Sequence, residues 1–187
     1  MKVLLVTAHP RQDSLTHQAA HAFASAAMVA GHQIEYADLV AEGFDPRMTP
    51  QDEPDWGDPK KSYSPAVQEE MARVERNDST VMFFPVWWWS TPAVLKGWID
   101  RVWNNGWAYG EPKYPHSRVW MVAIAGVNRA GYEKRGYDAA MQTQLKVGLL
   151  DFCGIPDTKL EIFYAALENA AAAQSIILQA QKLGTEF

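Results

Sequence analysis

Residues 83–110 read FFPVWWWSTPAVLKGWIDRVWNNGWAYG and contain six of the chain's eight tryptophans. The β-branched and aromatic run of residues 79–84 is typical of a buried strand. After it, Thr91 is a candidate helix cap with Pro92 at the first helical position, and apolar residues follow at helical spacing. Three adjacent tryptophans therefore lie between the carboxyl end of a strand and a helix, where open α/β sheets bind ligands. We predict that this loop is the floor of a site for a planar ligand.

The rest of the chain alternates between strand and helix patterns. This alternation predicts one domain over residues 1–187, with an α/β fold and a parallel, doubly wound sheet that has helices on both faces. Long loops are expected at residues 41–64 and 126–136. The expected strands are residues 2–8, 33–39, 79–84, 118–125 and 158–164, and the expected helices are residues 14–30, 65–77, 91–105, 137–152 and 169–183.

Composition narrows the class of protein. The 187 residues are 48% hydrophobic, enough for one sizeable core, and the net charge of −5 argues against nucleic acid or an anionic membrane as the main partner. No apolar run reaches the roughly 18 residues that cross a bilayer, and the first ten residues are too short an apolar stretch for a signal peptide. The single cysteine, Cys153, fits a reducing cytoplasm and lies in an apolar run, so we expect a buried structural thiol.

The sequence lacks the complete motifs of several familiar enzyme classes. No Gly-x-Gly-x-x-Gly follows the first strand, and no Gly-x-Ser-x-Gly elbow is present. Gly126 and Gly131 have the spacing of a phosphate loop, but no Lys-Ser/Thr pair follows them. His17 and His21 have the spacing of a zinc-protease helix, but a glutamine replaces the glutamate base, so we expect no metal site and solvent-facing or capping histidines.

The turn after the first strand, residues 9–16, carries polar side chains ahead of a helix. Its hydroxyls and free N–H groups at a helix N-terminus suit an anion, although Asp13 or Ser14 as an ordinary helix cap would explain the same residues. In a sheet of order 2-1-3-4-5, this turn neighbours the tryptophan loop. A phosphate on one loop and a flat ring on the next describe flavin mononucleotide, so the residues predict a flavodoxin-like flavoprotein.

The same residues carry a resemblance. The chain resembles the NAD(P)H:quinone oxidoreductase family, of the DT-diaphorase and potassium-efflux ancillary type, which has a flavodoxin-like fold. The similarity extends over most of the chain. The matching pieces are Ala8-His9-Pro10, Phe84 to Trp88, Pro92 to Val102, Gly106 to Gly110 and Phe152-Cys153-Gly154.

The resemblance implies roles for individual residues. On the phosphate side it places His9, Ser14 and Thr16, with Asp13 on the same turn as a further candidate. The flavin ring is lined by Pro85, Val86, Trp87, Trp88 and Trp89, in part through main-chain N–H groups, and by Gly126.

Two tyrosines are the implied catalytic residues. Tyr132 matches a tyrosine near the flavin's N1/O2 edge, and Tyr109 matches a substrate-facing tyrosine that reaches the partner's site in family dimers. The histidine usual after the first tyrosine is replaced by Asp138, and the family's Thr-Thr-Gly-Gly loop reads Ile-Ala-Gly-Val at residues 124–127. Stabilisation of the negative charge on the reduced flavin would then depend on Tyr132 and on backbone dipoles.

The function expected from the resemblance is two-electron transfer from NAD(P)H to a quinone or similar acceptor by a ping-pong mechanism. FMN is the expected cofactor and FAD stays open. Trp88, Trp89 and Tyr109 form the substrate wall of a cytoplasmic homodimer, while Trp98 and Trp103 are expected in the core or at the dimer contact. The alternative is a flavodoxin-like electron carrier, or a regulatory flavoprotein subunit that contacts a membrane transport protein.

Overall fold

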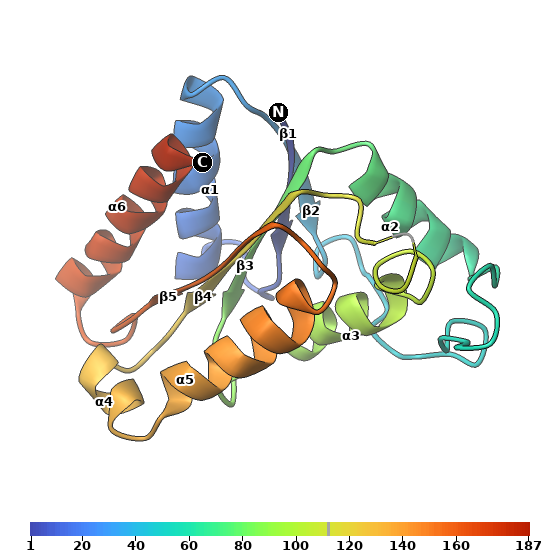
Figure 1. Cartoon of the computed structure of the whole chain (residues 1–187). Helices are drawn as coiled ribbons and strands as arrows, with labels where there is room; N and C mark the ends of the chain where they lie inside the picture. The colour runs from blue at the N-terminus through green and yellow to red at the C-terminus, as the bar shows by residue number, and fades with distance from the viewer. Residues whose placement is uncertain (112) are drawn as a thin grey trace.

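A computed structural model describes residues 1–111 and 113–187, and its centre is one parallel sheet (Figure 1). The strand order is β2-β1-β3-β4-β5, so the predicted flavodoxin-like order is confirmed. Because β1 lies between β2 and β3, the chain reverses its direction of winding at β1, and the loops after β1 and β3 meet there. The strands are β1 (Lys2–Thr7), β2 (Gln33–Asp38), β3 (Ser79–Pro85), β4 (Arg118–Ile124) and β5 (Asp157–Phe163).

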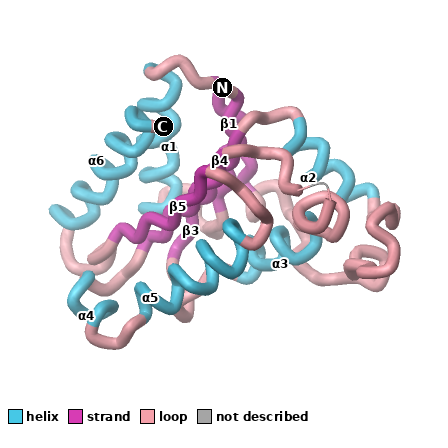
Figure 2. Tube along the Cα trace, viewed as in Figure 1, coloured by secondary structure: helices cyan, strands magenta, loops and turns pink. Residues whose placement is uncertain are grey.

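Helices cover both faces of the sheet (Figure 2). On one face α1 and α6 pack side by side, and α2, α3 and the helical segment after α4 cover the other. The helices are α1 (Leu15–Val29), α2 (Pro65–Glu75), α3 (Ala93–Val102), α4 (Arg129–Glu133), α5 (Tyr137–Met141), its π-helical continuation η1 (Gln142–Asp151) and α6 (Ala170–Glu186). In the described part of the chain, no helix has both the length and the apolar character needed to cross a membrane.

The alternation of side chains along β1 explains the two layers. Val3 and Leu5 point into the core beneath α1 and α6, whereas Leu4 and Val6 point into the core on the opposite face. All four side chains are fully buried. A strand covered on both faces reads as a continuous apolar run, which is why residues 2–8 were recognisable from sequence.

Three local predictions are corrected by the structure. Thr91 does not cap α3: Pro92 has an extended backbone, with ψ at 152°, so Pro92 itself occupies the cap position and the helix begins at Ala93. The expected loop 126–136 contains the short helix α4. The helix expected over residues 137–152 changes from α- to π-helical hydrogen bonding at Gln142.

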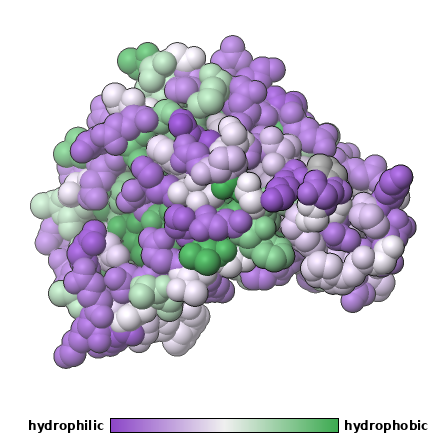
Figure 3. Space-filling model, in the orientation of Figure 1, coloured by the Kyte–Doolittle hydropathy of each residue, from purple (hydrophilic) through white to green (hydrophobic). Residues whose placement is uncertain are grey.

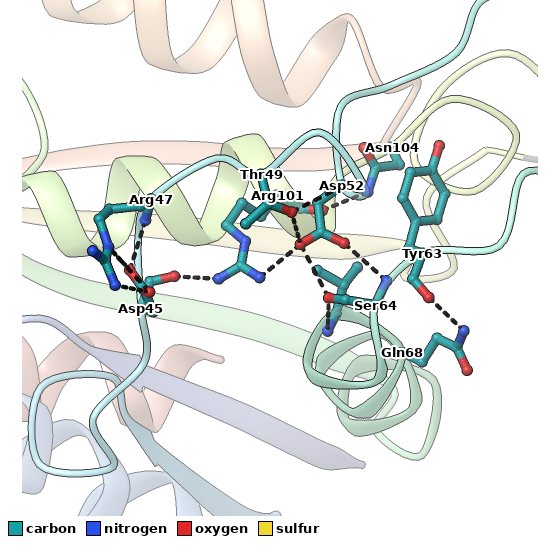
Figure 4. Close-up of polar contacts among 10 residues, drawn as sticks. Asp45, Arg47, Thr49, Asp52, Tyr63, Ser64, Gln68, Arg101 and Asn104 are labelled. Carbon is teal, nitrogen blue, oxygen red and sulfur yellow. Dashed lines mark hydrogen bonds and ion pairs between the residues drawn. The ribbon is translucent and has the colours of Figure 1, made fainter.

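The long loop of residues 41–64 is fixed to α3 by a buried ion pair (Figure 4). Arg101 Nη2 lies 2.7 Å from Asp52 Oδ2, and both side chains are almost fully buried. Ser64 donates to the same carboxylate through its N–H at 2.8 Å and its hydroxyl at 3.0 Å. The loop therefore has a defined position over α2 and α3, and Figure 3 shows this end of the molecule as mostly polar.

Candidate functional site

Two adjoining cavities lie at the carboxyl edge of the sheet, where β1, β3, β4 and β5 end. The larger, about 520 Å³ and here called the ring cavity, follows β3 and β4. The smaller, about 220 Å³ and here called the turn cavity, follows β1 and β3. They share Val86, Gly126 and Leu167, so together they form one elongated site.

The tryptophan loop is a tight two-residue turn. Trp87 and Ser90 exchange backbone hydrogen bonds of 3.3 and 3.2 Å, and Trp88 and Trp89 between them have φ values of 50° and 56°. Positive φ at both central positions defines a type I′ turn, which normally carries Asn-Gly. Each non-glycine residue in this region costs about 1–2 kcal/mol. Strain of this kind is typical of functional sites.

The ring cavity has aromatic walls. Trp88 and Trp89 come from the turn, and Trp89 packs against Tyr137 with ring centroids 4.1 Å apart. Tyr132 lines the same cavity and is only 4% exposed, with its ring edge-on to Tyr164 at 5.3 Å. Burial, together with Tyr164, raises the pKa of Tyr132, so its phenol remains a neutral hydrogen-bond donor at physiological pH.

The main-chain N–H groups of residues 86–89 differ in whether the protein uses them. Val86 N–H donates to the carbonyl of Ile124 at 2.9 Å, which ties the loop to β4. Within the described residues, the N–H groups of Trp88 and Trp89 have no protein acceptor. They are therefore available to the polar edge of a ligand.

The turn cavity is lined by the residues between β1 and α1. Ser14 caps α1 and accepts from His17 N–H at 3.3 Å, while Thr16 is buried beside it. His9 accepts from Arg11 N–H at 3.1 Å, and burial lowers the pKa of His9, which favours the neutral ring. The cavity thus opens on the N-terminal end of a fifteen-residue helix, where free N–H groups and the helix dipole favour an anion.

The structure brings together all but two of the predicted site residues. In the turn cavity it places His9, Ser14, Thr16, Pro85, Val86, Trp87 and Gly126, and in the ring cavity Val86, Trp88, Trp89, Gly126 and Tyr132.

Asp13 and Tyr109 lie outside both cavities. Asp13 is exposed on the turn, and its carbonyl accepts from Gln18. Tyr109 packs against Trp56 and Phe152, with centroid distances of 5.3 and 5.7 Å. Since Trp56 is 74% and Phe152 63% exposed, these three residues form an outward-facing aromatic patch.

Other aromatic and thiol predictions concern the core. Trp98 and Trp103 are buried with centroids 6.3 Å apart, which confirms a core position. Cys153 is buried and unpaired, and burial raises the pKa of its thiol to about 11, so it is not ionised at physiological pH.

Several residues of the site region were not predicted. Arg135 and Tyr137 follow α4 and line the ring cavity, and Leu167 follows β5 and lines both cavities. His17, expected to face solvent or to cap, is buried and contacts Arg11 and Ser14 of the turn. The position of Leu167 just after a strand was an available signal, because every parallel strand ends at this edge.

The sequence profile of the family described as flavodoxin-like fold matches residues 1–185. The chain belongs to this family. A relative in Escherichia coli strain K12, the uncharacterized NAD(P)H oxidoreductase YcaK, is 38% identical over 97% of this chain and 96% of its own length. The ribosyldihydronicotinamide dehydrogenase [quinone] of Pongo abelii is 28% identical over 88% of this chain and 81% of its own.

A solved structure agrees with these matches. The NAD(P)H:quinone oxidoreductase from Methanothermobacter marburgensis superposes with a TM-score of 0.93, at 26% identity, over 100% of this chain and 95% of that one. The family resemblance inferred from the sequence motifs is therefore confirmed.

Proposed function

We propose that the protein is an FMN-dependent NAD(P)H:quinone oxidoreductase, with the flavin ring in the ring cavity and the phosphate in the turn cavity. The observation that carries this proposal is the pair of joined cavities: one has aromatic walls, and the other opens on the N-terminus of α1. A flat heterocycle joined by a chain to a phosphate matches both ends. The activities named for YcaK, the Pongo abelii relative and the Methanothermobacter enzyme support the same reaction class.

Gly126 supports the fit of a ligand that spans both cavities. A Cβ at this position would lie 2.9 Å from Leu167 Cδ1, at the place where the cavities meet. The lack of a side chain keeps this junction open. FMN ends at its phosphate, which the turn cavity suits, whereas FAD would extend the ligand beyond Thr16 and stays the second choice.

The protein's residues supply position and environment, and the bound flavin would accept hydride from NAD(P)H and pass two electrons to the acceptor. Trp88 and Trp89 exclude water from one side of the ring cavity. Their N–H groups would hold the polar edge of the ring. Tyr132, kept neutral by burial, donates a hydrogen bond where negative charge develops.

Donor and acceptor are expected to bind in turn at the same place in the ring cavity. Trp88 is 87% exposed, so its indole offers a face for any flat group that enters. The shared surface makes the reaction ping-pong. A quinone is the preferred acceptor, because it is flat and takes two electrons.

The outward-facing patch of Trp56, Tyr109 and Phe152 supports a homodimer. Exposed aromatic groups of this size usually mark an interaction surface, and a two-fold dimer would bring Tyr109 to the partner's ring cavity. We assign the enzyme to the cytoplasm, with contact to a membrane transport protein as an additional role that does not exclude catalysis.

Stopped-flow spectroscopy tests the activity. Purified protein should contain about one flavin per chain, and chromatography of the cofactor released by heating should give FMN. Bleaching of the flavin by NADPH within seconds, followed by rapid reoxidation by a quinone, is the expected result. Reduction over many minutes would instead indicate the electron carrier or regulatory subunit.

A further inference from the structure

His17 contacts three groups through its ring, and two of them, Ser14 and Arg11, belong to residues that line the turn cavity. It is the third residue of α1 and is 3% exposed. Its Nδ1 lies 3.0 Å from the carbonyl oxygen of Arg11 and 3.0 Å from Ser14 Oγ. Its Nε2 lies 3.0 Å from Asp38 Oδ2 at the end of β2. The ring therefore joins the turn after β1 to the neighbouring strand.

The hydrogen-bonding capacity of the surrounding groups constrains the direction of each bond. The Arg11 carbonyl and the Asp38 carboxylate only accept, so the ring donates from Nδ1 and from Nε2 in the arrangement that satisfies both. Asp38 is held in turn by Gln12 Nε2 at 2.5 Å and by Ala41 N–H at 3.1 Å. The carboxylate is thus a fixed anchor for the ring.

The same hydrogen-bonding capacities determine what Ser14 can do. Ser14 Oγ receives the backbone N–H of His17 at 3.3 Å and also faces the Nδ1 proton, which it shares with the Arg11 carbonyl. A hydroxyl has two acceptor positions and one proton. With both acceptor positions occupied by N–H donors, the hydroxyl proton of Ser14 is left to donate, and Ser14 lines the turn cavity.

We propose that His17 is a positioning residue for flavin binding: it orients the Ser14 hydroxyl as a hydrogen-bond donor to the phosphate and holds the turn of residues 11–14 in place. The inference rests on the proposed function, because it takes the phosphate to lie in the turn cavity. The position of the Asp38 carboxylate agrees with this proposal. The ring of His17 faces the turn, while the carboxylate of Asp38 lies on the far side of the ring.

Two amide replacements separate the two nitrogens of the ring. In His17→Asn the amide N–H₂ approximates Nδ1, so the bond to Ser14 can remain. In His17→Gln it approximates Nε2, so the bond to Asp38 can remain and the one to Ser14 is lost. His21→Gln is the matched control, because His21 is exposed on the same helix and does not line the cavity.

The test compares FMN with riboflavin, which has the same ring and no phosphate. Apoprotein variants are titrated with each flavin, and quenching of flavin fluorescence gives the two Kd values. We expect His17→Gln to raise the Kd for FMN about tenfold, which corresponds to the loss of one charge-assisted hydrogen bond. The Kd for riboflavin should rise less than twofold. His17→Asn should retain most of the preference for FMN, and His21→Gln all of it. Equal weakening of both flavins in both His17 variants, or no change in His17→Gln, would overturn the proposal.

A double-mutant cycle tests whether His17 acts through Ser14. Ser14→Ala and the double variant Ser14→Ala/His17→Gln should lose the same preference for FMN, because the second change removes support from an absent hydroxyl. Additive losses would overturn this route. If His17→Gln does not fold, Ser14→Ala decides alone: a retained FMN preference contradicts the proposal. If the unaltered apoprotein binds neither flavin, the proposed function itself is wrong.

Discussion

Trp87 and Ser90 exchange both of their backbone hydrogen bonds across a turn whose two central residues are tryptophans in the left-handed region. The turn closes the ring cavity, and its geometry would suit Asn-Gly better than Trp-Trp. The sequence therefore retains a strained backbone at this turn, and the turn places two indole rings and two N–H groups without a protein acceptor among the described residues at the site. This relationship connects the stability of the fold with the binding of the ligand.

Trp88→Asn should stabilise the apoprotein while it weakens binding. Asparagine tolerates φ near 50°, and the 87% exposed indole loses little packing when it is removed. We expect unfolding in urea to require about 0.5–1 kcal/mol more free energy, and KM to rise for NADPH and for quinone together. Trp56→Asn is the control for the stability change alone, since Trp56 is exposed but is not in the left-handed region. A destabilised Trp88→Asn apoprotein would show that the turn is not strained.

Gly126→Ala should reduce flavin affinity without unfolding the protein. The added methyl group meets only the end of the Leu167 side chain, which is 86% exposed and can move. It nevertheless fills the junction of the two cavities. We expect a loss of flavin affinity of at least tenfold with a Tm change of about 2 °C or less. The double variant Gly126→Ala/Leu167→Ala should recover part of the affinity, and failure to recover any would mean that Leu167 is not the group displaced.

Asp52→Asn should destabilise the fold and change its response to acid. Burial alone would raise the pKa of Asp52, but the Arg101 guanidinium and the donors of Ser64 and Thr49 hold it below its ordinary value. Because the folded pKa is the lower one, the ion pair contributes stability above about pH 4, and this contribution is lost as the pH falls through the folded pKa.

The change leaves a buried guanidinium without its partner, so we expect a loss of roughly 3–5 kcal/mol at pH 7. The difference between the parent and the variant should shrink as the pH falls below about 4, which urea unfolding at several pH values measures. The exposed pair of Lys96 and Asp100 is the matched control, and Asp100→Asn should cost less than about 1 kcal/mol. A difference that is independent of pH would contradict an ionised Asp52.

The sequence predicted the parts of the site that follow directly from strand ends. Loops after β1 and β3 carry the site because parallel strands end at one edge of the sheet. Both loops were recognisable from their residue types, polar side chains after β1 and tryptophans after β3. The positive φ of Trp88 and Trp89 had no such signal in the sequence, since bulky residues rarely adopt it. The role of His17 depends on Asp38, which lies twenty-one residues away and meets it only through the pairing of β1 with β2.

The aromatic patch predicts that the protein assembles as a homodimer. If Trp56, Tyr109 and Phe152 cover the partner's ring cavity, the protein should sediment as a dimer at micromolar concentration. Trp56→Lys/Phe152→Lys, which places two charges on the patch, should favour the monomer and lower activity while flavin remains bound, because the patch residues line neither the ring cavity nor the turn cavity. Sedimentation and flavin absorbance measure the two effects. A fully active monomer would remove the partner from the site.

Tyr109→Phe should separate the two halves of the catalytic cycle. Burial raises the pKa of Tyr109, so its phenol is a neutral donor suited to a quinone oxygen. The variant keeps the ring and its packing on Trp56, and it loses one hydrogen bond of about 0.5–1.5 kcal/mol, or up to tenfold in rate. In stopped flow, reoxidation by quinone should slow by this factor, while reduction by NADPH stays nearly unchanged. Initial-rate plots at several fixed quinone concentrations should remain parallel, as a shared binding place requires. Equal slowing of both half-reactions would exclude Tyr109 from contact with the acceptor, and intersecting plots would mean that NADPH and quinone bind together.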